Sequence, residues 1–99
     1  MPVYMIIEVE VVDEKTYAEY IEMVPATVGK YDGRYLVRGG QVTPISGDWH
    51  TGRIILLEFP SAEQLQRWLA SPEYQEIAPL RMRSTKSKAI MVEGYPAAY

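Results

Sequence analysis

Residues 3–12 read VYMIIEVEVV and are followed by Asp13. Apolar side chains occupy every odd position of this stretch, whereas the even positions mix apolar residues with Glu8 and Glu10. A period of two with β-branched residues predicts a strand with one fully apolar face and one mixed face. Asp13 fits a helix N-cap, so we expect the chain to pass almost directly from this strand into a helix.

The residues after Asp13 predict the first helix. Pro25 is expected to end or kink it near residue 24, or to open a further turn through residue 28. Asp32 and Gly33 then mark a turn in which the glycine is expected to take a positive φ. One apolar stripe at helical spacing is formed by Tyr17, Tyr20, Ile21 and Val24.

Two strands separated by a long loop come next. RYLVR at residues 34–38 predicts a second strand with Arg34, Leu36 and Arg38 on one face. RIILLEF at residues 53–59 predicts a third strand that carries Glu58 near its end. The intervening residues 39–52 are rich in Gly, Pro, Ser and Asp and are too long for a tight hairpin. Loops of that length often carry function or contacts.

The last third of the chain predicts a second helix and a fourth strand. Ser61 followed by Gln64 has the spacing of a capping box. Ser71 and Pro72 are expected to end this helix and to start a further turn. KAIMVE at residues 88–93 predicts the fourth strand. We therefore expect a single domain over residues 1–94 and a short C-terminal tail over residues 95–99.

The order of elements is β-α-β-β-α-β, which predicts an α+β, ferredoxin-like fold. Its four-stranded antiparallel sheet would carry both helices on one face. The other face would hold Tyr4, Ile6, Leu36 and one side of the third strand. So large an apolar surface is unusual on a soluble monomer. We therefore expect a homodimer in which two sheets pack face to face and form a dimeric α/β barrel.

Composition excludes several classes of protein. The 99 residues have a net charge of −3, which argues against nucleic acid as a partner. No apolar run approaches the roughly 20 residues of a membrane span, so no membrane association is expected and the location is predicted to be cytoplasmic. The chain has no cysteine and one histidine. We therefore predict no metal site, and no motif indicates a cofactor.

Residues 24–40, VPATVGKYDGRYLVRGG, resemble the bacterial domain-of-unknown-function family 1330, as do GDW at residues 47–49 and SPEY at residues 71–74. The resemblance covers nearly the whole chain and implies a dimeric α/β barrel. Relatives on that superfamily fold include antibiotic-biosynthesis-type monooxygenases, muconolactone isomerases and haem-using enzymes. Ser46 stands where the family usually has Glu, and Leu69 where it often has an aromatic residue. The resemblance therefore implies a fold rather than a reaction.

Charged side chains on the mixed face of the sheet are the first candidates for a site. Guanidinium groups bind carboxylates in bidentate geometry, and a desolvated carboxylate can serve as a general base. The alternative interpretation is a set of structural ion pairs. The candidate ligand-binding residues are Arg34, Arg38, Glu58 and Glu8, with Tyr20 and Trp49 shaping the pocket. No catalytic residue is assigned.

Two further features have competing interpretations. His50 lies beside Asp48 in the long loop and would either transfer protons or be exposed to solvent. Its neighbour Trp49 is expected to cover the contact between two subunits. The basic run Arg81, Arg83, Lys86 and Lys88 would be either a nucleic-acid patch or a solvated helix end, and the helix dipole favours the second.

The leading functional hypothesis is a homodimer that binds a small organic molecule, with an anion as one option, in the barrel cavity. A second hypothesis is a cofactor-independent monooxygenase or isomerase of the antibiotic-biosynthesis-monooxygenase or muconolactone-isomerase type. A third is a purely structural dimer whose barrel is filled by side chains. A solvent-connected cavity lined by the two arginines would separate the first two from the third.

Overall fold

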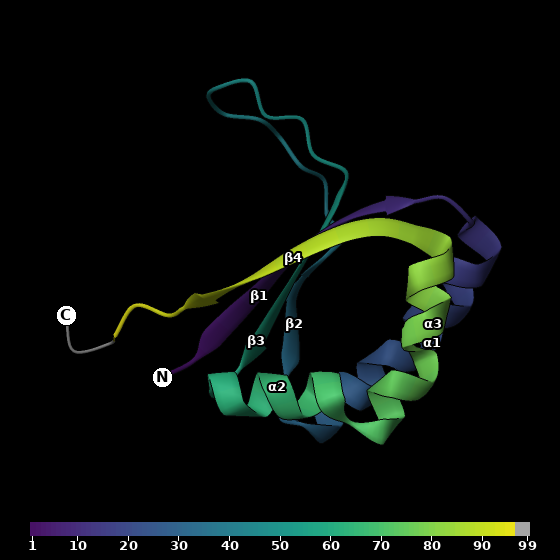
Figure 1. Ribbon diagram of the computed structural model, residues 1–99. Helices are drawn as coiled ribbons and strands as arrows, with labels where there is room; N and C mark the ends of the chain where they lie inside the picture. The colour runs from purple at the N-terminus through teal and green to yellow at the C-terminus, as the bar shows by residue number, and fades with distance from the viewer. Residues whose placement is uncertain (97–99) are drawn as a thin grey trace.

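Four strands form one antiparallel sheet in the computed structural model, which describes residues 1–96 (Figure 1). They are β1 (Val3–Val11), β2 (Arg34–Arg38), β3 (Arg53–Phe59) and β4 (Thr85–Glu93), in the spatial order β2-β3-β1-β4. The helices α1 (Glu14–Lys30), α2 (Ala62–Ala70) and α3 (Pro72–Ser84) cover one face. The expected ferredoxin-like fold is confirmed. The predicted tail includes residues 97–99, which lie outside the described residues, and the domain limits stay a prediction.

The hydrophobic core lies between the sheet and the helices. Val3 and Val9 of β1 are buried against it, as the alternation of this strand predicts. Phe59 at the end of β3 is fully buried and packs on Trp68 of α2, with 5.4 Å between ring centroids. Each such side chain contributes roughly 1.5–3 kcal/mol by leaving water. This face of the sheet is therefore stabilised within a single chain.

Ser71 both ends one helix and begins the next. Its hydroxyl donates to the carbonyl of Trp68 at 2.7 Å and accepts from the backbone N–H of Tyr74 at 3.1 Å. Pro72 occupies the first turn of α3, where its missing N–H is not needed. The expected turn is therefore a full helix of 13 residues. It leads directly into β4, which begins at Thr85 and not at Lys88 as expected.

Helix α1 runs through Pro25 without a break, so the expected end near residue 24 is wrong, whereas the alternative of a further turn through residue 28 agrees with the structure. Proline has no N–H to donate to the carbonyl four residues earlier, which is that of Ile21. The guanidinium of Arg38 donates to this carbonyl instead. A side chain from the neighbouring strand thus replaces the missing hydrogen bond of the helix.

A β-bulge changes the orientation of the second half of β2. Tyr35 pairs with Leu57, but Val37 pairs with Leu56, so Leu36 is an extra residue. A shift of one residue exchanges the two faces of a strand. Arg38 therefore lies on the helix-covered face, over the ring of Tyr35 at 5.0 Å. The prediction that Arg34 and Arg38 share a face is wrong.

The turn before β2 uses its glycine for close packing. Asp32 adopts the positive φ of 64°, so the prediction that Gly33 supplies it is wrong. A Cβ atom at Gly33 would lie 2.6 Å from Cε1 of Phe59 and 2.8 Å from Cγ1 of Val28. Real Cβ contacts are not that short, so a side chain at this position displaces the core.

Candidate functional site

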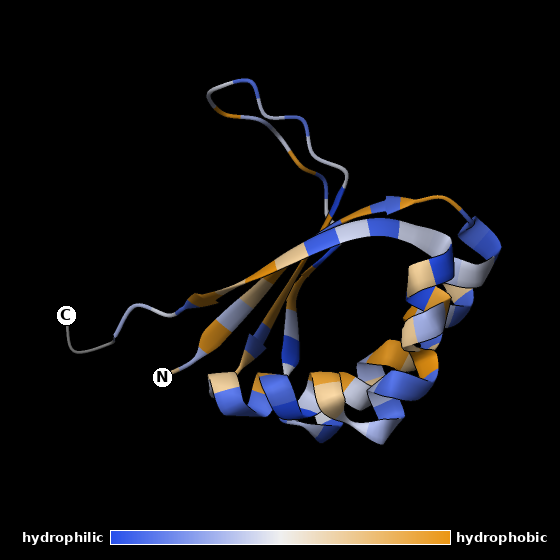
Figure 2. Ribbon diagram, viewed as in Figure 1, coloured by the Kyte–Doolittle hydropathy of each residue, from blue (hydrophilic) through white to orange (hydrophobic). Residues whose placement is uncertain are grey.

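The helix-free face of the sheet has an apolar centre. Ile6 of β1 pairs with Ile90 of β4 and with Leu56 of β3, and Tyr4 pairs with Val92. The side chain of Ile90 is 61% exposed. Figure 2 shows apolar residues along the C-terminal half of β4, away from the helices. The expected uncovered apolar face is therefore present.

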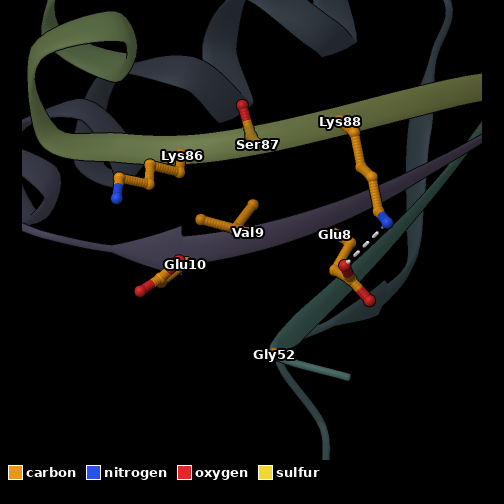
Figure 3. A pocket seen from close by; sticks show the side chains of 7 residues that line it. All are labelled: Glu8, Val9, Glu10, Gly52, Lys86, Ser87 and Lys88. Carbon is orange, nitrogen blue, oxygen red and sulfur yellow. Dashed lines mark ion pairs between the residues drawn. The ribbon is translucent and has the colours of Figure 1, made fainter. Parts of the chain in front are cut away.

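Charged residues occupy both ends of this face. Glu8 and Lys88 reach toward each other from β1 and β4, with 3.4 Å between carboxylate and ammonium (Figure 3). Glu10 and Lys86 form the next cross-strand pair and line the same shallow pocket of about 420 Å³. At the other end, Arg34 binds Glu58 with an N–O distance of 3.1 Å. Because each charge faces an opposite charge, both ends resemble the polar rim of an interface.

Residues 39–52 form an arm without helix or strand, as predicted, and it projects away from the helices (Figure 1). Trp49 is 70% exposed and Ile45 is 91% exposed. Between the arm and Ile6 and Ile54 of the sheet lies an apolar groove of about 350 Å³. His50 pairs with Asp48 at 2.9 Å, and both side chains are almost fully exposed. The solvated interpretation of His50 therefore fits the structure.

A smaller cavity of about 140 Å³ lies on the other side of the sheet, between β1, β4 and the helices. Tyr20 of α1 is the predicted site residue that lines it. Its polar lining also includes hydroxyl groups from α3 and β4 and one guanidinium. The lining residues are Met5, Ile7, Tyr20, Trp68, Leu69, Tyr74, Arg81, Ser87, Lys88 and Ala89.

A hydrogen-bond network forms one wall of this cavity, which we call the Arg81 cavity. The hydroxyls of Tyr20 and Tyr74 lie 3.1 Å apart and are buried. Arg81 donates from Nε to the hydroxyl of Tyr74 at 3.1 Å and from Nη1 to Oγ of Ser87 at 2.9 Å. Burial raises the pKa of Tyr20 well above its ordinary value of 10.0. Tyr20 therefore keeps its proton at neutral pH.

The structure does not bring the six predicted site residues together. Arg34 and Glu58 lie at one end of the helix-free face and Glu8 at the other. Arg38 is bound to the carbonyl of Ile21, and Trp49 lies in the arm. Neither Arg34 nor Arg38 lines any of the pockets described above, so none of these is the expected cavity lined by both arginines.

Sequence reasoning missed Arg81, Tyr74 and Ser87. Tyr74 and Arg81 are seven residues apart, which is about two helical turns and places both on one face of α3. Because only a short turn was expected there, this spacing was not used, and Arg81 was assigned to a solvated basic run. Ser87 alternates with Lys86 and Lys88 in β4, which places its hydroxyl on the helix-covered face.

The part of the chain that the structure describes contains neither a candidate metal site nor a membrane-spanning helix. No group of three His, Cys, Asp or Glu side chains lies close enough to hold a metal ion within residues 1–96. Over the same residues, no helix is long and apolar enough to cross a membrane. The cytoplasmic location stays a prediction.

Comparison with protein families gives one match. The model of the family described as a domain of unknown function (DUF1330) matches residues 2–95. No curated protein matches the sequence. The family resemblance found in the sequence is therefore confirmed over nearly the whole chain.

Solved structures with the same fold include two proteins of unknown function. One from Rhodopseudomonas palustris is 18% identical with a TM-score of 0.79, and the match covers 96% of this chain and 83% of that one. A dimeric ferredoxin-like protein from Jannaschia sp. CCS1 is 11% identical with a TM-score of 0.72, covering 95% and 100%.

A third solved structure is that of an enzyme. SnoaB, a cofactor-independent oxygenase from Streptomyces nogalater, is 11% identical with a TM-score of 0.60, and the match covers 97% of this chain and 95% of that one. At these identities the comparisons establish the fold alone.

Proposed function

Because the chain belongs to the family described as a domain of unknown function (DUF1330), we propose its function from its own geometry. Two copies pack sheet against sheet, and each copy encloses a small organic molecule in its Arg81 cavity. The observation that carries the binding function is that cavity, which lies between sheet and helices and is lined by aromatic rings and a few polar groups. Sites for small molecules commonly have this composition.

The anatomy of the helix-free face supports the homodimer. Its apolar centre around Ile6 and Ile90 is flanked by the ion pairs Glu8–Lys88 and Arg34–Glu58. Interfaces between proteins combine an apolar core with a polar rim in the same way. The solved neighbour from Jannaschia, described as dimeric, has the same fold. A second copy of this chain is therefore the occupant that we propose for this face.

The arm extends the same surface. The groove beneath it is continuous with the helix-free face through Ile6 and Ile54. Oγ1 of Thr51 in this groove is buried and has no hydrogen-bond partner among the described residues. A buried hydroxyl without a partner is destabilising. We propose that the partner subunit fills this groove and covers Trp49.

The size of the Arg81 cavity sets the size of the ligand. Its volume of about 140 Å³ corresponds to about five water molecules at roughly 30 Å³ each. The ligand is therefore a compact molecule, much smaller than a nucleotide or a polycyclic compound. Tyr20, Tyr74 and Arg81 supply hydrogen-bonding groups, while Trp68 and Ile7 supply apolar walls.

An oxygenase reaction on the bound molecule is the second candidate function. The observations that favour it are the fold shared with SnoaB and the tryptophan and two tyrosines that line the cavity. Consumption of dissolved oxygen together with the co-purifying molecule would support it. Binding without oxygen consumption or isomerisation would leave a binding protein.

Native mass spectrometry of the purified protein tests the dimer and the ligand together. We expect a mass of twice the 11.3 kDa chain, plus a small molecule in each subunit. Ala89→Leu places a larger side chain in the wall of the cavity and should lose this molecule, because Ala89 lines the cavity and pairs with Ile7. The exposed substitution Ala18→Leu is the matched control. A monomer mass would refute the dimer, and an unchanged ligand in Ala89→Leu would refute the binding site.

A further inference from the structure

The guanidinium of Arg81 lacks an anionic partner within residues 1–96. The arginines Arg34 and Arg67 each bind a glutamate, but no carboxylate oxygen of the described residues lies within 4.0 Å of Arg81. Its side-chain hydrogen bonds go to two neutral hydroxyl groups, those of Tyr74 and Ser87. A half-buried charge that binds only neutral groups favours an anion beside it.

The paired tyrosines provide a second donor. Between them Tyr20 and Tyr74 carry two hydroxyl protons, and the 3.1 Å contact between their oxygens uses one of them. Arg81 donates to Tyr74 and so consumes no proton of the pair. One phenolic proton is therefore left over in a buried position, where it needs an acceptor.

No other residue that lines the cavity supplies a negative charge for Arg81. None of the residues that line the cavity is acidic. The ammonium of Lys88 pairs with Glu8 across the helix-free face, so it does not act as the charged group of this cavity. The cavity thus offers one fixed positive charge, one spare hydroxyl proton and apolar walls.

We propose that the Arg81 cavity is a binding site for a small carboxylate. The guanidinium of Arg81 binds one carboxylate oxygen, the spare proton of the Tyr20–Tyr74 pair binds the other, and Trp68 and Ile7 pack against the organic part. This inference rests on the proposed function and adds the charge and chemical class of the ligand. A carboxylate satisfies both donors, whereas a neutral amide of the same shape leaves the guanidinium unneutralised.

Isobutyrate and isobutyramide test the charge requirement, because they have the same shape and differ in charge. Ligand-observed saturation-transfer NMR on the wild-type protein should give a dissociation constant at least about tenfold lower for isobutyrate. Arg81→Met should remove this preference, and Tyr74→Phe should weaken isobutyrate binding while Arg81 keeps its bond to Ser87. The exposed Arg83→Met is the matched control and should bind isobutyrate like the wild type.

The alternative is that Arg81 only fixes α3 to β4. In that case Arg81→Met would lower the melting temperature but leave isobutyrate binding unchanged, and the proposal would be wrong. It would also be wrong if the wild-type protein bound the amide as tightly as the acid, or bound neither. A neutral molecule retained in native mass spectrometry would refute the carboxylate site while leaving the proposed small-molecule function intact.

Discussion

The two faces of the sheet are built from the same strands but depend on different partners. On the helix-covered face, Leu57 and Phe59 are almost completely buried by helices of their own chain. On the helix-free face, Ile90 is as apolar but 61% exposed, and Ile6 is only half-buried. Burial within one chain stabilises at any concentration, whereas burial against a second copy depends on concentration. The helix-covered face therefore stabilises the fold of one chain, whereas the helix-free face would stabilise the assembly of two chains.

The largest expected effect comes from placing a charge on the helix-free face. Leu56→Asp would bury an unpaired carboxylate beside Ile6 if two copies pack there. We expect the dissociation constant of the dimer to rise by at least about 100-fold, measured by sedimentation velocity. Met82→Asp, at an exposed apolar residue of α3, is the control and should leave the dimer unchanged. Equal dissociation constants for both variants would contradict the assignment of the interface.

The helix-covered face is disrupted most directly at Gly33. Gly33→Val places a side chain against Phe59 and Val28 and should destabilise the protein by about 1–3 kcal/mol, measured by urea unfolding. Gly29→Val is the matched control, because a Cβ there meets no atom within 4 Å. A Gly33→Val protein that unfolds like the wild type would show that the core adapts. The Leu56→Asp experiment should, by contrast, leave this core intact.

The smallest change in stability is expected for a substitution of Arg38. This predicted site residue lies on the helix-covered face because of the bulge. Arg38→Met removes the donor to the carbonyl of Ile21 and should cost about 1 kcal/mol in thermal or urea unfolding. Pro25→Ala restores a backbone N–H for that carbonyl. In this background Arg38→Met should cost less, and any remaining loss belongs to the contact with Tyr35. Equal costs in both backgrounds would contradict the replacement of the helix bond by Arg38.

The sequence predicted the fold better than the site, for identifiable reasons. The alternation in residues 3–11 and the caps at Asp13 and Ser61 correctly predicted β1 and the starts of α1 and α2, since these signals are local. The bulge at Leu36 left no mark in RYLVR, and it moved Arg38 to the other face. The Arg81 cavity is lined by residues of five elements, β1, α1, α2, α3 and β4, and no local sequence pattern shows that these elements meet in space.

The bulge at Leu36 also has a consequence for changes in the length of the chain. Deletion of Leu36 would leave Tyr35, Val37 and Arg38 opposite Leu57, Leu56 and Ile55, so Arg38 would stay on the helix-covered face. The same deletion would therefore leave the guanidinium of Arg38 beside the carbonyl of Ile21. Replacement of Leu36 keeps the bulge, whereas its removal gives a regular strand in which Arg38 lies on the same face as before. The number of residues at this position therefore matters less than the face on which Arg38 lies.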